Sequence, residues 1–194
     1  MAKQVWKPGN MVYPLPAAMV SVGNENGETN ILIIAWTGTI CTNPAMLYIS
    51  VRPERYSYDI IKESGEFVVN LTTEALAKAT DFCGVRSGRD VDKWKQTGLT
   101  RGKANALQYA PIINECPVNI ECKVTEIKEL GSHHMFMAEV VSVQVDDEYL
   151  DEKGKFCLNH TGLMAYSHGE YVSLGKTIGT FGYSVRKKKQ EKAC

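Results

Sequence analysis

Alternation of apolar and polar residues in the middle of the chain predicts two long β-strands. The stretch from Val118 to Leu130 begins with apolar and polar residues in strict alternation, from Val118 to Thr125. Gly131 and Ser132 begin a turn, and Met135 to Val145 returns as a second strand. Strands of this length suit a barrel, in which one face fills the interior and the other meets solvent or a partner. The apolar face comprises Val118, Ile120, Cys122 and Val124, and the polar face comprises Asn119, Glu121, Lys123 and Thr125.

Shorter apolar runs elsewhere are typical of further strands. Met19 to Gly23 and Thr29 to Ala35 flank the turn residues 24–27, which indicates a hairpin. Met46 to Val51 and Glu66 to Leu71 are also apolar, β-branched and bounded by breakers. Most of the chain is therefore expected to be β-structure.

The predicted helices are few and short. Ser57 is suited to cap a helix from Tyr58 to Ser64, which Gly65 would end. A second helix is expected from Thr72 or Thr73 to Ala79, and Asp90 can cap a third from Val91 to Thr97. No internal repeat and no Pro/Ser-rich linker divides the chain. We therefore predict one mainly β domain over residues 1–194, with its core at about 14–184 and a charged tail at 185–194.

Composition excludes several classes of protein. The 194 residues carry 22 Lys plus Arg and 22 Asp plus Glu, so no overall charge attracts the chain to nucleic acid. No apolar run is long enough to span a bilayer, and the first residues lack the apolar stretch of a signal peptide. We expect a cytoplasmic protein with no nucleic-acid or membrane partner.

The six cysteines do not indicate a metal site. None of them has the C-x-x-C spacing of a zinc knuckle or a thioredoxin-type motif. Cys116 and Cys122 have the parity of one strand face and are expected to be core thiols. We therefore predict no bound metal.

Three segments carry the candidate chemistry. Ala35-Trp36-Thr37-Gly38-Thr39 ends an apolar strand with small residues and one large aromatic ring, so that a flat ligand can approach the backbone. The segment 50–57 ends another strand and enters a helix with two arginines, a pattern that suits a phosphate. The Gly/Ser loop at 83–94 adds Arg86, Arg89 and Lys93. Together these segments predict a ligand with a planar ring at one end and a phosphate at the other.

These segments resemble the flavin reductase-like, FMN-binding split-barrel family, and within it the flavoredoxin branch. The matching residues are AWTGTICTNPAMLYISVRPERYSYDIIKESGEFVVNL at 35–71, CGVRSGRDVDKW at 83–94 and AYSHGEYVSLGKTIGTFGYS at 165–184. The branch often has a double proline after the Thr-Asn pair, where this chain has Pro44-Ala45. The resemblance implies a mainly β, six-stranded split β-barrel with short peripheral helices, which forms a homodimer with one non-covalent FMN per subunit near the interface.

The resemblance also implies a role for each matching residue. The isoalloxazine ring would lie along Ala35, Trp36, Thr37, Gly38 and Thr39. The ribityl chain and phosphate would follow Ser50, Val51, Arg52, Arg55, Tyr56 and Ser57. The site would be closed by Ser87, Asp90 and Lys93, with Trp94 as a wall.

The expected activity follows from the flavin, which supplies its own redox chemistry and needs no catalytic side chain. His168, with Tyr166 and Tyr171, could line the face that a nicotinamide meets, or could pack at an interface or the barrel rim. We expect an oxidoreductase that takes electrons from NAD(P)H onto FMN and passes them to flavin, ferric iron or a protein partner. Two alternatives are an electron carrier with no nicotinamide site, and a non-redox module that senses flavin or haem.

Overall fold

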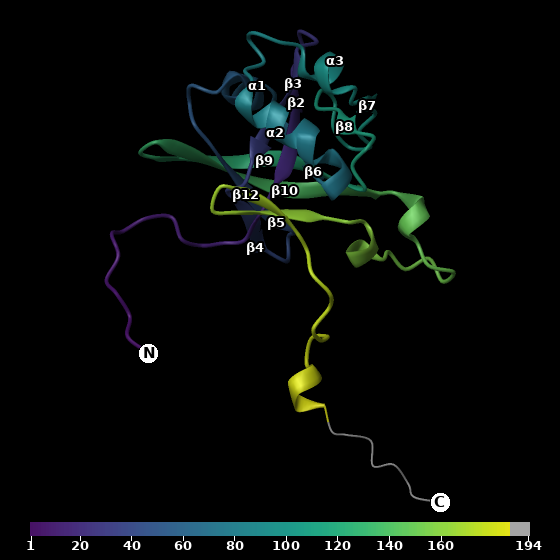
Figure 1. Cartoon of the computed structure of the whole chain (residues 1–194). Coiled ribbons are helices and arrows are strands. Elements are labelled where there is room, and N and C mark those ends of the chain that lie inside the picture. Colours follow the sequence, from purple (N-terminus) through teal and green to yellow (C-terminus); the bar gives the residue numbers. More distant parts are fainter. Residues whose placement is uncertain (187–194) are drawn as a thin grey trace, which may run out of the picture.

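The computed structural model describes residues 1–186 and is built around one antiparallel sheet (Figure 1). Within these residues the sheet has seven strands, one more than the six expected, because Thr37–Cys41 pairs with the strand after it. In spatial order the strands are β3 (Thr29–Ile34), β2 (Ala18–Gly23), β6 (Glu66–Leu71), β9 (Val118–Leu130), β10 (His133–Val145), β5 (Met46–Val51) and β4 (Thr37–Cys41). The expected mainly β, split-barrel fold class is confirmed.

The long hairpin β9–β10 runs through the centre of this sheet. Its turn is Gly131-Ser132, and Gly131 has a φ of 54°, a left-handed conformation that costs glycine little. The strand β10 begins at His133, two residues earlier than predicted. The polar face of β9 was expected to meet solvent or a partner, but its first half is covered by the chain itself, since Asn119 and Glu121 are buried beneath the segment 104–113.

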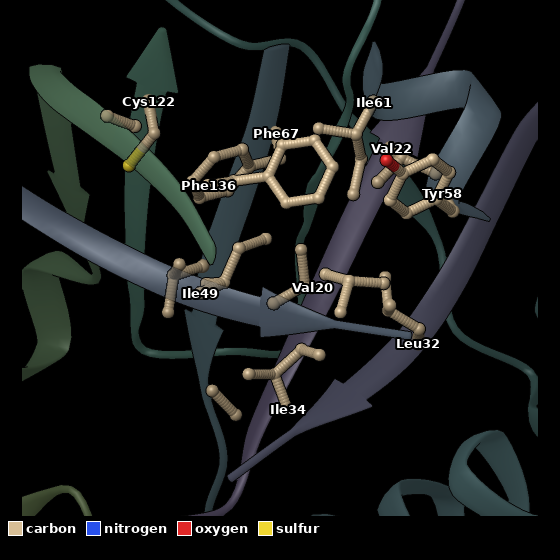
Figure 2. Close-up of a cluster of buried hydrophobic side chains, with 14 of the residues drawn as sticks. Val20, Val22, Leu32, Ile34, Ile49, Tyr58, Ile61, Phe67, Cys122 and Phe136 are labelled. Carbon is tan, nitrogen blue, oxygen red and sulfur yellow. The ribbon is translucent and has the colours of Figure 1, made fainter. Parts of the chain in front are cut away.

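The main core fills the inside of the curved sheet. Figure 2 shows Phe67 of β6 and Phe136 of β10 close together, with Val20, Leu32 and Ile49 from three other strands around them. The helix α1 (Tyr56–Ser64) closes this core with Tyr58 and Ile61. Alternate residues of β2, β5 and β6 therefore point into one apolar interior, as the sequence pattern predicted.

A second apolar cluster lies on the outer face of β2 and β3. It contains Met19 and Ile31 from these strands, and Trp94 from α3 (Lys93–Thr97). Because both faces of β2 are covered, all six of its residues are buried. Cys116 belongs to this cluster and Cys122 to the main core, so both are core thiols, but they do not share a strand face as expected.

The helices differ from the prediction mainly at their starts. The helix α1 begins at Tyr56 rather than Tyr58, and Gly65 ends it in the left-handed conformation, as expected. The second predicted helix is a single turn, Glu74–Leu76, followed by α2 (Ala77–Val85). The third, α3, starts at Lys93 with Asp92 as its cap, because the Asp92 carboxylate accepts a hydrogen bond from the Lys95 amide.

Shorter elements complete the described chain. A second sheet has the order β1 (Leu15–Pro16), β11 (Met164–Ser167) and β12 (Glu170–Ser173), and β7 (Arg101–Gly102) pairs with β8 (Ile112–Ile113). Single helical turns lie at Asp147–Tyr149, Leu158–His160 and Tyr183–Val185. Both ends of the chain extend from the body (Figure 1). No helix in residues 1–186 is long and apolar enough to cross a membrane, and most of the expected charged tail, residues 187–194, lies outside the described residues.

Candidate functional site

A cavity of about 430 Å³ opens where the turn after β5 faces the loop after α2. Its floor is formed by β3, which supplies Asn30, Leu32 and Ile33. Its sides carry five cationic side chains, whereas Glu54 is the one acidic residue that lines it in the described chain. The five cations are Arg52, Arg55, Arg86, Arg89 and Lys93. A cavity with this lining favours an anion that carries more than one negative charge.

The turn from β5 into α1 presents two of these arginines. The backbone amide of Arg55 donates to the carbonyl of Arg52 at 3.0 Å, so the two residues belong to one tight turn. Arg52 also contacts Glu54, with an N–O distance of 3.5 Å between two largely exposed side chains. An ion pair this exposed contributes little stability, so Arg52 is available to a ligand.

The loop after α2 reaches across the cavity to this turn. The Arg89 guanidinium donates to the Glu54 carbonyl at 3.0 Å and lies 5.5 Å from the centre of the Tyr56 ring. Gly88 packs so closely on β3 that a Cβ atom there would lie 2.5 Å from the Asn30 side-chain oxygen and 2.6 Å from Tyr56. The loop can approach the cavity this closely because residue 88 has no side chain.

Lys93 is the buried cation of the site, with 4% of its surface exposed. Its ammonium donates to the carbonyl of Ile31 in β3 at 2.6 Å and to the carbonyl of Cys83 in α2 at 2.7 Å. Burial lowers the pKa of Lys93 to about 8, and no carboxylate in residues 1–186 pairs with it. A buried charge is costly without a counter-charge, so this ammonium points to an anionic ligand.

Ser57 is oriented by a residue that the sequence analysis did not single out. The Asn30 amide donates to the Ser57 hydroxyl at 2.8 Å, and the Ser57 side chain is fully buried at the start of α1. The expected capping role of Ser57 is therefore wrong, because the helix starts one residue before it. The signal for Asn30 was a polar residue inside a run of apolar strand residues.

The predicted ring segment runs along β5, and Trp36 lies next to the end of β5 that leads into the cavity. The Ser50 amide donates to the Trp36 carbonyl at 2.9 Å, and the Thr37 hydroxyl donates to the Tyr48 carbonyl at 2.6 Å. The Trp36 ring lies 4.4 Å from the His133 ring, centre to centre. In the sheet, His134 pairs with Val51, so His133 lies close to Arg52. The cationic cavity, Arg52, His133 and Trp36 thus form one continuous surface.

Comparison with known proteins agrees with this arrangement. Residues 11–175 match the model of the flavin reductase like domain. The chain belongs to this family. An uncharacterized protein of Archaeoglobus fulgidus is 31% identical over 159 residues, which cover 82% of this chain and 87% of that protein.

Two solved flavoredoxin structures are similar to this flavin reductase-like chain over almost its whole length. The flavoredoxin of Desulfovibrio vulgaris (Miyazaki F) has a TM-score of 0.87 at 27% identity and covers 95% of this chain and 100% of its own. The flavoredoxin of Methanosarcina acetivorans has a TM-score of 0.84 at 29% identity, with the same coverage. The resemblance to the flavin reductase-like family and its flavoredoxin branch is confirmed.

In this flavin reductase-like chain, most of the predicted phosphate residues meet in one place. The cavity is lined by Arg52, Arg55, Tyr56, Ser57, Ser87 and Lys93. Val51 is buried in the core, Ser50 is half-buried, and Ala35 and Thr37 to Thr39 lie along the β3–β4 connection and β4. Asp90 lies beside the cavity, in a neighbouring polar hollow that also contains Arg89 and Lys93.

Two predicted residues of this flavin reductase-like chain lie elsewhere. Trp94 does not line the cavity, because it is the apolar residue of α3 and packs into the outer cluster beneath Arg101. His168 lies in the turn between β11 and β12, 5.7 Å from the Tyr13 ring and outside the cavity. In contrast, His133, which the sequence analysis did not single out, packs on Trp36; burial and the charge of Arg52 lower its pKa.

Proposed function

We propose that this protein binds one non-covalent FMN, with the phosphate in the cationic cavity and the ring along Ala35 to Thr39. The observation that carries the proposal is the buried Lys93, which lines one cavity with four arginines and has no carboxylate partner within residues 1–186. A phosphate dianion supplies the missing counter-charge, and Arg52 and Arg55 can bind it with charge-assisted hydrogen bonds. The family assignment and the flavoredoxin neighbours support a flavin as the rest of the ligand.

We propose further that the bound flavin takes electrons from NAD(P)H and passes them to flavin, ferric iron or a protein partner. Flavins accept a hydride and can release electrons singly, so the chain itself needs to bind and orient rather than to react. The residues that would do this are the cations around the phosphate and the backbone groups at 35–39 around the ring. An electron carrier with no nicotinamide site is the second candidate, and the similarity to two flavoredoxins favours it.

The proposed assembly is a homodimer. Large apolar side chains are exposed at both ends of the β9–β10 hairpin and on β4, and such side chains favour burial against a partner. Ile40, Leu130 and Val143 are examples, each at least 46% exposed. Light scattering of the purified protein tests this, and a monomer at micromolar concentration would contradict it.

Anaerobic spectroscopy tests the redox proposal. The purified protein is expected to be yellow, with flavin absorbance near one equivalent per chain, and NADH or NADPH should bleach that absorbance rapidly. If only dithionite bleaches it, the protein is an electron carrier with no nicotinamide site. A colourless protein that does not bind added FMN would contradict both.

Arg55→Ala tests the position of the phosphate. A charge-assisted hydrogen bond contributes about 1.5–3 kcal/mol, so FMN affinity should fall by about 10- to 100-fold. Riboflavin, which has the same ring and no phosphate, should lose no affinity. Lys62→Ala is the matched control, because Lys62 is an exposed cation of α1 that does not line the cavity. Flavin fluorescence titration measures all four combinations.

A further inference from the structure

A second cavity, of about 340 Å³, is lined by Trp36 and shares no residue with the cationic cavity. The N-terminal segment 9–15 forms one wall, and Trp36 and Tyr48 form the other. No charged side chain lines this cavity in the described chain. The lining of this cavity therefore differs in charge from that of the cationic cavity, which is lined by five cationic side chains.

Aromatic contacts connect this second cavity to the rest of the fold. The Trp36 ring contacts His133 on one side, and the Tyr48 ring packs over Gly38, where a Cβ would lie 3.2 Å from it. Tyr13, in the N-terminal wall, lies 6.2 Å from Tyr166, so the wall is attached to the β11–β12 hairpin. Three aromatic side chains, Tyr13, Trp36 and Tyr48, thus line a mostly apolar space beside the segment where the flavin ring is proposed to lie.

We propose that this cavity binds a planar, uncharged aromatic electron acceptor of the quinone class. The proposal rests on the proposed function, and it names the class of molecule that accepts electrons from the proposed flavin site. Aromatic walls bind flat rings by stacking and by burial of apolar area, and a lining without charges offers nothing to a phosphate or a charged iron chelate. In the net reaction, NAD(P)H gives a hydride equivalent and solvent gives one proton, so that the quinone becomes a hydroquinone and NAD(P)⁺ is released.

The N-terminal wall provides variants that leave the flavin site intact. Met11 and Val12 line the cavity, are exposed at 63% and 81%, and lie outside the cationic cavity. We would replace both by aspartate, which places two charges beside the acceptor. Val5→Asp with Trp6→Asp is the matched control, because these exposed apolar residues belong to the same N-terminal segment but do not line the cavity.

The experiment measures turnover of the flavin-loaded protein with two acceptors. An uncharged naphthoquinone reports on the proposed cavity, and ferricyanide, a charged ion that accepts electrons without an apolar site, reports on flavin reduction alone. The Met11→Asp/Val12→Asp variant should raise KM for the naphthoquinone about tenfold or more, the effect typical of damaged apolar complementarity. Its KM for ferricyanide and its flavin content should match those of the wild type.

Three results would overturn this proposal. The first is an equal change for both acceptors, and the second is an equal change in the Val5→Asp/Trp6→Asp control. The third is an unchanged KM for naphthoquinone; if the oligomeric state is then altered, the cavity belongs to the contact with a second copy of the chain. Failure of the proposed function is distinguishable, because the wild-type protein would then reduce neither acceptor with NAD(P)H, either because it binds no flavin or because NAD(P)H does not reduce the bound flavin.

Discussion

Two buried charges in this fold have opposite surroundings. Glu121 of β9 is fully buried, and its carboxylate accepts hydrogen bonds from the amides of Asn105 and Ala106, at 2.8 and 2.6 Å, and from the Gln144 side chain at 2.8 Å. Lys93 is almost as buried, but its ammonium donates to two neutral carbonyls, and it lines a cavity that four arginines also line.

The difference separates a structural charge from a binding charge. The hydrogen bonds to Glu121 hold a loop onto the sheet, and together they outweigh burial and keep its pKa below the usual value. The surroundings of Lys93 do not neutralise it, and burial lowers its pKa to about 8. We infer that Glu121, whose hydrogen bonds hold a loop of the fold, is a structural charge, whereas Lys93, which lines a cavity together with four arginines, is a binding charge.

Removing the structural charge should have the largest effect. Glu121→Ala leaves the amides of residues 105 and 106 without an acceptor in a buried place, so the free energy of unfolding should fall by about 3–5 kcal/mol. Urea denaturation measures this change. Any protein that still folds should bind FMN with wild-type affinity.

Glu126→Ala is the control for this prediction. Glu126 is an exposed carboxylate on the same strand, and its loss should change the free energy of unfolding by no more than about 0.5 kcal/mol. Equal destabilisation by both substitutions would show that the hydrogen bonds to Glu121 do not have the role assigned to them.

Removing the binding charge should act on the ligand instead. Lys93→Met keeps the length and apolar part of the side chain, and it should weaken FMN binding by about 10- to 100-fold while leaving riboflavin affinity unchanged. Lys95→Met, at an exposed position of the same helix, should change neither affinity. Equal loss of FMN and riboflavin binding would indicate damage to the fold rather than loss of a phosphate contact.

The affinity for FMN should also depend on pH through Lys93, with a smaller effect than the substitution of Lys93. A bound phosphate raises the pKa of Lys93, so FMN affinity should be full below about pH 8 and fall by at most tenfold per unit as pH rises through that value. Riboflavin affinity should stay constant over this range. A pH-independent FMN affinity between pH 7 and 9.5 would contradict the role of Lys93.

The free energy of unfolding of the ligand-free protein should also depend on pH, through both Lys93 and Glu121. The pKa of Lys93 in the folded chain, about 8, lies below its ordinary value of 10.5, so the unfolded chain binds more protons between these values and stability should rise with pH there. The lowered pKa of Glu121 gives stability that is present above the pKa of an unfolded carboxyl and is lost as pH falls through the folded value. Urea titrations at several pH values test both slopes.

Sequence patterns predicted the regular parts of this fold well. The bounds of β5, β6 and β9 match the expected ones, because turn residues, prolines or glycine flank each strand and apolar residues mark its buried face. The strand β4 was not predicted, because its Thr-Gly-Thr start has no apolar alternation. It becomes a strand by pairing with β5, a contact that the local sequence does not indicate.

The candidate site was predictable in its residue types and less so in its geometry. Arginines near a helix start indicated an anion, and they do converge in one cavity. The burial of Lys93 and the inward packing of Trp94 depend on which face of α3 meets the sheet, and a helix of five residues is too short to reveal that face by periodicity. The contact of His133 with Trp36 joins residues almost one hundred positions apart, so no local sequence pattern predicts it.

Gly88 has a further consequence for attempts to redesign this protein. Because a single methyl group at this position would collide with the side chains of both Asn30 and Tyr56, either these side chains or the loop after α2 would have to shift. The close approach of the two arginine-bearing loops thus depends on the missing atom at residue 88 as well as on the contacts of Arg89 with Glu54 and Tyr56. Libraries that vary the ligand preference of the cavity should therefore keep residue 88 as glycine and change the cations around it.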